Sequence, residues 1–139
     1  MELWFETRPI TNGLNGLHRF FPELNGAKST IVPASDVIED DEHYRFYLEM
    51  PGLAAESVEV HAEDDSLVVE AERKRPEWSK EAQLHLNERH YGAIRRAFRL
   101  PENASHDQIR ASYKDGVLEV TVPKRPEAKP LRIKVEHQN

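Results

Sequence analysis

Acidic pairs, histidines and serines are the side chains of this sequence that could do chemistry. Asp40-Asp41 and Asp64-Asp65 could supply a general acid and a general base, but adjacent residues in a polar turn point apart and stay hydrated. None of the seven histidines belongs to an H-E-x-x-H pair, and His85 and His90 do not have the i, i+4 spacing of two ligands on one helix face. No serine lies in a G-x-S-x-G motif. We therefore expect no catalytic site and no metal site.

Nucleotide and thiol chemistry also lack their motifs. The sequence contains neither G-x-x-x-x-G-K-S/T nor G-x-G-x-x-G, so we expect no phosphate cradle and no bound cofactor. Cysteine is absent, which excludes a disulfide framework, a thiol nucleophile and a zinc-thiolate site. A fold without disulfide or metal cross-links must be stabilised by packing, and the absence of disulfides is usual for cytoplasmic proteins.

The charge balance argues against two classes of partner. The 139 residues carry a formal net charge of −6, which repels nucleic acid and anionic membranes at long range. We interpret Arg73-Lys74-Arg75 and Arg95-Arg96 as solvated faces. No apolar run reaches the ~18 residues of a membrane span, and Met1–Glu6 has acids where a signal peptide has lysines. We expect a cytoplasmic protein.

Composition divides the chain into three regions. Residues 1–33 are rich in aromatics, Gly, Asn and Pro, which predicts a short adaptable arm with apolar side chains. Residues 34–124 show the two-residue period of half-buried strands. Residues 125–139 begin rich in Pro, Lys and Glu and read as an extended C-terminal extension. Its aliphatic residues stand at alternate positions: Leu131, Ile133 and Val135.

Strands are predicted wherever apolar and polar residues alternate. The apolar members of these strands are Tyr44, Phe46, Leu48 and Met50; Val58, Val60 and Ala62; Leu67, Val69 and Ala71; Ile94, Phe98 and Leu100; Ile109, Ala111 and Tyr113; and Leu118, Val120 and Val122. Pro51-Gly52 suits a type II turn, and Asp115-Gly116 suits a two-residue hairpin turn. About seven short strands with such turns predict an all-β, immunoglobulin-like antiparallel β-sandwich.

The connection from Arg73 to Arg89 is too long for a tight hairpin, and a compact domain rarely leaves such a stretch without a task. Leu84-His85-Leu86 could form one more short strand within it. A helix from Ser79 to Leu86 is the alternative.

Four motifs in this order resemble the α-crystallin domain of the small heat shock protein family, over about ninety residues. They are Met50-Pro51-Gly52-Leu53, the strand from Leu67 to Arg73, the segment Glu88-Arg89-x-x-Gly92-x-Ile94-x-Arg96-x-Phe98-x-Leu100-Pro101, and the segment from Ala111 to Lys124. Ala71 stands where the family usually has glycine, and Ile94 where an aromatic is common. Both are apolar and leave the fold prediction unchanged.

The resemblance implies a homodimer of sandwiches. In the bacterial and plant type, which the length of the 73–89 connection matches, a strand of this loop pairs with the partner's sheet. Leu84, His85 and Leu86 would then be dimer contacts. Arg96 matches the family's arginine that makes charged contacts at the dimer interface; a cross-strand partnership with a carboxylate is the alternative.

The extension carries a second implied contact. Ile133-Lys134-Val135 resembles the family's aliphatic-x-aliphatic tail motif, with Leu131-Arg132-Ile133 as another register. By resemblance, this pair docks in an apolar groove at the sandwich edge of another dimer and builds a larger homo-oligomer. The expected lining is Val58, Val60, Ile109 and Ala111. The tail could instead cap its own subunit, and a plain dimer remains open because the arm is short.

The function implied by the resemblance is that of an ATP-independent holdase chaperone, which binds partly unfolded proteins under stress and suppresses their aggregation. ATP-dependent chaperones would later refold what it holds. The expected client contacts in the arm are Trp4, Phe5, Leu14, Leu17, Phe20 and Phe21. One alternative is a co-chaperone of the related sandwich type that docks on an ATP-driven chaperone. Another is a sandwich hydrolase or ligand-binding module, for which the strands offer no convergent polar residues.

Overall fold

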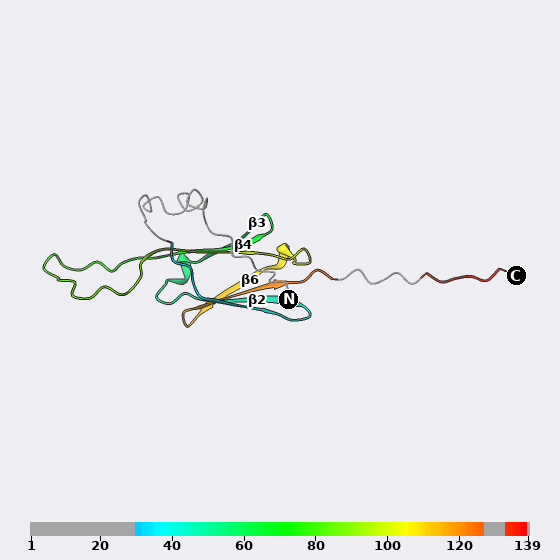
Figure 1. Ribbon diagram of the computed structural model, residues 1–139, viewed down its shortest axis with the longest axis horizontal. Coiled ribbons are helices and arrows are strands. Elements are labelled where there is room, and N and C mark those ends of the chain that lie inside the picture. Colours follow the sequence, from blue (N-terminus) through cyan, green and yellow to red (C-terminus); the bar gives the residue numbers. More distant parts are fainter. Residues whose placement is uncertain (1–29, 127–132, 139) are drawn as a thin grey trace.

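Two antiparallel sheets form the molecule. The computed structural model spans residues 1–139, and residues 30–126 and 133–138 are described here. The strands are β1 (Ser35–Glu39), β2 (His43–Glu49), β3 (Glu59–Glu63), β4 (Ser66–Arg73), β5 (Gly92–Arg99), β6 (Arg110–Lys114) and β7 (Val117–Pro123). One sheet has the order β1-β2-β7-β6 and the other the order β3-β4-β5. Figure 1 shows them as two layers, with β3 and β4 in one and β2 and β6 in the other.

The core lies between the two layers, and it is formed by apolar side chains at alternate positions of the strands. Tyr44, Phe46 and Leu48 of β2 are buried and alternate with more exposed residues. The rings of Phe46 and Phe98 meet across the layers with centroids 4.9 Å apart and an interplanar angle of 56°. The β-sandwich predicted from the sequence is therefore confirmed.

Strand β4 departs from the expected alternation. Leu67, Val69 and Ala71 belong to the core, as their spacing predicts, but Val68 and Glu70 between them are also buried. Half-buried strands show a period of two, whereas strands covered on both faces show a continuous buried run. Both faces of β4 are therefore covered.

The two turns predicted from Gly positions form as expected. Gly52 has φ +75°, as the third residue of a type II turn requires, and Asp115 and Gly116 have φ +53° and +77°. Gly116 also lies against the first turn, because a Cβ atom added to it would come within 3.2 Å of the Pro51 Cα. The β6–β7 hairpin thus fits closely beside the turn after β2.

Strand β1 was not predicted, and the segment proposed as an additional strand forms none within this chain. Ser35–Glu39 pairs with β2 from Ser35↔Leu48 to Glu39↔Tyr44. Residues 82–88, which include Leu84-His85-Leu86, have no regular secondary structure. The alternative helix from Ser79 to Leu86 does not form either, since a single turn-type hydrogen bond joins the Ala82 N–H to the Ser79 carbonyl there. In Figure 1 this green connection between β4 and β5 extends away from the sandwich.

Within the described ranges, helical structure is limited to two 3-10 turns, η2 (Ala55–Ser57) and η3 (His106–Gln108). No helix among these residues is long and apolar enough to cross a membrane.

Candidate functional site

The apolar edge expected to accept a tail lies where β3 and β6 end the two sheets. β3 and β6 are each the outermost strand of their sheet, and β5 and β1 are the strands at the opposite ends. Arg96 of β5 contacts Pro33, just before β1, so β5 and β1 lie at one edge of the sandwich and β3 and β6 lie at the other. Val58, Val60 and Ile109 are half-buried and pack against the core, while Ala111 is exposed. We call these four residues the β3–β6 edge. It offers apolar surface beside strands whose outer backbone groups are unpaired within the described chain.

The three residues expected at the dimer interface project from the 74–91 connection. Leu84 and Leu86 are 52% and 71% exposed, and His85 is exposed. Exposed leucines on an extended segment are costly unless something covers them. Strand β1, the other outermost strand of the four-stranded sheet, carries Ile38 at 49% exposure.

Arginines and aromatics hold the base of this connection. The Arg73 guanidinium donates from Nε and Nη2 to the Pro51 carbonyl, at 3.0 and 2.7 Å, and from Nη1 to the His90 carbonyl at 3.2 Å. The ring of Tyr91 lies under the guanidiniums of Arg75 and Arg89, at 4.8 and 5.2 Å from its centroid. The Arg89 Nη1 also donates to the Tyr91 hydroxyl at 2.7 Å. Both ends of the connection are thereby fixed to the sandwich.

Sequence reasoning missed this arginine and aromatic cluster. Arg73 and Arg75 were interpreted as solvated charges, since Arg73 and Pro51 are far apart in sequence and their contact needs the folded chain. The signal that could have found them is the presence of Tyr91 and Trp78 among closely spaced arginines.

Arg96 bonds within its own subunit. Its Nη1 donates to the Pro33 carbonyl at 2.7 Å and lies 3.3 Å from the Ser35 Oγ, and the guanidinium lies over the Phe98 ring at 5.0 Å. Its Nε is buried without a partner. Arg96 forms no ion pair with a carboxylate among the described residues, so the cross-strand alternative fails there. It holds the start of β1, the edge that a partner strand would meet.

The described part of the tail motif is exposed. Ile133 and Val135 are 80% and 78% exposed, whereas Leu131 lies outside the described residues. The six expected client contacts also lie outside them: Trp4, Phe5, Leu14, Leu17, Phe20 and Phe21.

The start of the C-terminal extension is fixed by a polar cluster. The Lys124 Nζ donates to the Glu39 Oε1 at 2.7 Å and lies 5.0 Å from the Tyr44 ring centroid. This hydrogen bond raises the pKa of Lys124 above its ordinary value, and burial raises the pKa of Tyr44, whose hydroxyl donates to the Asn103 Oδ1 at 2.7 Å. The Arg125 N–H donates to the Asn103 carbonyl. The extension therefore leaves the sandwich from a defined point.

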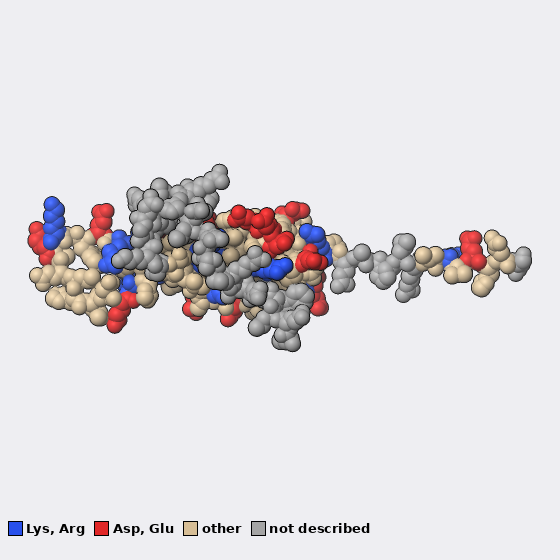
Figure 2. Space-filling view, turned by 45° about the horizontal axis from the view of Figure 1, so that its top comes forward, with Lys and Arg blue, Asp and Glu red and all other residues tan. Residues whose placement is uncertain are grey.

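Asp40, the first residue of one acidic pair, stabilises the turn between β1 and β2. The Asp40 Oδ1 accepts from the backbone N–H groups of Glu42 and His43 at 2.9 and 2.8 Å, and its Oδ2 pairs with the Arg45 Nη1 at 2.6 Å. The two backbone bonds are the main reason that the pKa of Asp40 is lowered. Among the described residues, no three His, Asp or Glu side chains are placed to hold a metal ion. Figure 2 shows basic and acidic side chains interspersed on the described surface.

Known proteins match both the sequence and the fold. The 18.1 kDa class I heat shock protein of Medicago sativa is 38% identical over 140 residues, which cover 96% of each chain. Spore protein SP21 of Stigmatella aurantiaca is 38% identical over 118 residues, 85% of this chain and 69% of that protein. A small heat-shock protein from Xylella fastidiosa has a crystal structure with a TM-score of 0.68 at 34% identity, covering 78% of this chain and all of that one.

The family model described as Hsp20/alpha crystallin family matches residues 36–136, from β1 through the tail motif. The match includes every strand of the sandwich, the 74–91 connection and the exposed Ile133 and Val135. The chain therefore belongs to the Hsp20/alpha crystallin family, the small heat shock proteins, and is a stress-response chaperone rather than an enzyme.

Proposed function

We propose that this chaperone is an ATP-independent holdase, which binds partly unfolded proteins and keeps them from aggregating. The observation that carries the proposal is the match of residues 36–136 to the small heat shock protein family, and the large apolar side chains of the arm, among them Trp4, Phe5 and Phe20, supply surface for clients. Such surface can bind non-native chains reversibly. Aggregation needs two non-native chains to meet, so a lower free concentration slows it steeply.

Client binding is assigned to the arm of residues 1–33, through Trp4, Phe5, Leu14, Leu17, Phe20 and Phe21. Flexible apolar side chains can adapt to many client sequences. The β3–β6 edge is the second candidate surface, because it combines half-buried valines with unpaired strand backbone. The 34–124 domain then serves as the scaffold that presents both.

Dimerisation is assigned to the 74–91 connection. Leu84, His85 and Leu86 would add a strand to β1 of a second copy, because β1 is an outermost strand and Ile38 on it is half exposed. Replacement of Leu84 and Leu86 by serine should convert dimers to monomers in sedimentation velocity. Val117→Ser, at 36% exposure, is the matched control and should leave the dimer intact. Dimers that persist in the double variant would move the interface elsewhere.

Larger assembly is assigned to the tail motif. Ile133 and Val135 lie on the same side of an extended segment and would enter the β3–β6 edge of another dimer together. The Xylella fastidiosa relative is described as having a distinct high order structure. Glycine at both positions should reduce the mass measured by light scattering to that of a dimer, whereas Lys134→Gly should not. A wild-type chain that is itself only a dimer would contradict this docking.

The location and the further partners of the protein are also part of this proposal. We place the protein in the cytoplasm, with ATP-dependent chaperones acting after it and without nucleic acid as a partner, since the net charge is −6 and no cysteine is present. No contact or surface among the described residues favours the co-chaperone alternative.

The direct test is capture of a client without nucleotide. A heat-labile enzyme warmed with the chain should elute with it in one large complex on size exclusion, whereas the same enzyme warmed alone should precipitate. An enzyme that precipitates while the chain elutes unchanged would contradict the proposal.

A further inference from the structure

The base of the 74–91 connection gathers positive charge that no carboxylate of the described chain neutralises. Arg73, Lys74, Arg75 and Arg89 lie where the connection leaves and re-enters the sandwich, and none of them forms an ion pair among the described residues. Three cations elsewhere on the sandwich are each paired with a carboxylate. Figure 2 shows basic side chains where this narrow connection meets the body of the molecule.

Three guanidiniums meet around Tyr91 and Gly52. Those of Arg75 and Arg89 lie 4.8 and 5.2 Å from the Tyr91 ring centroid. A Cβ atom added to Gly52 would lie 3.6 Å from the Arg89 Nη2 and 3.8 Å from the Arg73 Nε, so these two side chains also approach each other. Like charges at such separations repel one another, since salt screens them only beyond a Debye length of about 8 Å. An anion placed among them would offset this repulsion.

Two of these arginines are held in place by the fold itself. The Arg73 guanidinium donates to the Pro51 and His90 carbonyls, and the Arg89 Nη1 donates to the Tyr91 hydroxyl. Because a guanidinium has five N–H donors, both side chains keep donors that no group of the described chain accepts. Side chains that are already ordered lose little conformational entropy when a ligand binds. The cluster therefore presents prearranged donors to an incoming anion.

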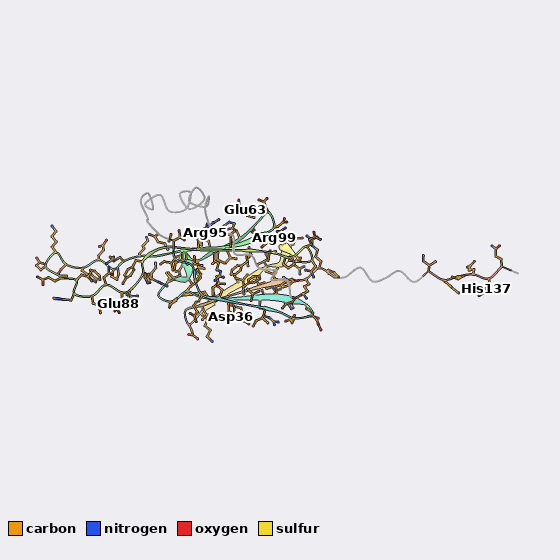
Figure 3. All side chains as sticks on the ribbon, in the orientation of Figure 1. Asp36, Glu63, Glu88, Arg95, Arg99 and His137 are labelled. Atoms are coloured by element: carbon orange, nitrogen blue, oxygen red, sulfur yellow. The ribbon has the colours of Figure 1, made fainter. Side chains whose placement is uncertain are left out.

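The carboxylates nearest along the chain do not occupy this position. Glu72, Glu77 and Glu88 flank the arginines in sequence, but none of them forms an ion pair among the described residues. Figure 3 shows Glu88 on the connection, outside the sandwich, and Asp36 on the sheet that contains β2. A ligand at the cluster must therefore bring its own negative charge.

We propose that the arginine and aromatic cluster of Arg73, Arg75, Arg89 and Tyr91 binds a phosphate-bearing anion. A phosphate offers several oxygens and more than one negative charge, so it can accept from two guanidiniums at once, and the planar fork of arginine matches its geometry. Inorganic pyrophosphate and the diphosphate of a nucleotide share this chemistry. The bound anion would join the end of β4 to the segment before β5 and so strengthen the base of the connection.

The test is isothermal titration calorimetry of the full chain with inorganic pyrophosphate, at an ionic strength kept constant with sodium chloride. Arg75→Gln with Arg89→Gln should weaken binding about tenfold or more, because two charged fork donors are lost. The control, Arg99→Gln with Arg110→Gln, makes the same change in net charge at exposed positions outside the cluster and should keep the wild-type affinity. ADP should bind like pyrophosphate, and adenosine should not bind.

Several results would overturn this proposal. Pyrophosphate affinity that the cluster substitutions leave unchanged would place the anion elsewhere, and an equal loss in the control would mean that binding follows net charge alone. Binding of ADP without binding of pyrophosphate would mean that the nucleoside is recognised. A wild-type chain that binds no pyrophosphate, with dimers that dissociate in the cluster variant, would assign the arginines to a carboxylate of a second copy. Client capture is measured separately, so the holdase proposal stands or falls independently.

Discussion

The guanidinium of Arg73 donates two hydrogen bonds to the carbonyl oxygen of Pro51, from Nε at 3.0 Å and from Nη2 at 2.7 Å. The arginine ends β4 in one sheet and the proline begins the turn after β2 in the other. This contact joins the two layers at the point where the 74–91 connection leaves the sandwich. It therefore fixes the base of the segment to which we assign dimerisation.

Loss of the hydrogen bonds between Arg73 and Pro51 should lower the stability of the folded chain. Arg73→Ala should lower the free energy of unfolding by about 1 kcal/mol, and Arg73→Lys by somewhat less, because an ammonium is a single point charge without the planar fork. Urea unfolding followed by circular dichroism measures both. Arg99→Ala on the same sheet, at an exposed position, is the control and should stay within about 0.5 kcal/mol of wild type. An equal effect of the two alanine variants would remove the special role of Arg73.

The buried pair of Glu70 and Arg95 should respond to the loss of one partner. Their side chains are 3% and 14% exposed, so Glu70→Ala leaves an arginine with little water to replace the carboxylate. We expect a loss of about 3 kcal/mol in unfolding free energy. Glu59→Ala, directly opposite Glu70 on β3 but exposed, should change it little.

Replacing both partners distinguishes pairing from packing. The double variant Glu70→Leu with Arg95→Met removes both charges and keeps most of the volume. It should be more stable than Glu70→Ala. A double variant that is less stable than the single one would contradict this account of the pair.

Two glycines with the same backbone angle should differ in their tolerance of alanine. Gly52 and Gly116 have φ +75° and +77°, and a residue with a Cβ atom is destabilised at either position because this left-handed backbone brings the Cβ close to a carbonyl oxygen. At Gly116 it would also meet the Pro51 Cα at 3.2 Å, whereas at Gly52 the nearest atoms are ends of arginine side chains at 3.6 and 3.8 Å. Gly116→Ala should cost about 2 kcal/mol and Gly52→Ala about 1 kcal/mol. Equal losses in denaturant titrations would refute the close approach.

The turn before β2 should be sensitive to acid through Asp40. Its pKa is lowered in the folded chain, chiefly by the N–H groups of Glu42 and His43, so its contribution is present above the ordinary Asp pKa. That contribution is lost as the pH falls through the lowered value. Asp40→Asn should therefore reduce the Tm at about pH 6, and the difference from wild type should shrink steadily as the pH falls below the ordinary Asp pKa. A Tm difference that persists in acid would contradict this origin.

Sequence patterning predicted the sandwich because most strands bury only one face. Tyr44, Phe46 and Leu48 alternate strictly, and the structure places all three in the core. The turn residues Gly52, Asp115 and Gly116 were predictable for a related reason, since positive φ angles restrict residue choice. β1 escaped prediction because its Ser35–Glu39 sequence carries two acids and only Val37 packs on the core.

Long-range polar contacts could not be predicted. Arg96 was expected at a dimer interface, which one chain does not test, or opposite a carboxylate; within the chain its Nη1 donates to the Pro33 carbonyl, a contact between segments about sixty residues apart. Backbone carbonyls are present at every residue, so no sequence signal marks the one that accepts. The segment Leu84-His85-Leu86 has no strand partner within one chain, and the strand that we propose for it requires a second copy.

The most direct measurement is light scattering from a heat-labile protein warmed with this chain at equal subunit ratios, without nucleotide or other proteins. The account predicts that scattering is suppressed in proportion to added chain, and that an equal mass of an inert protein has no such effect. Scattering that rises equally fast with and without the chain would contradict the central claim that its exposed apolar surface holds unfolded proteins.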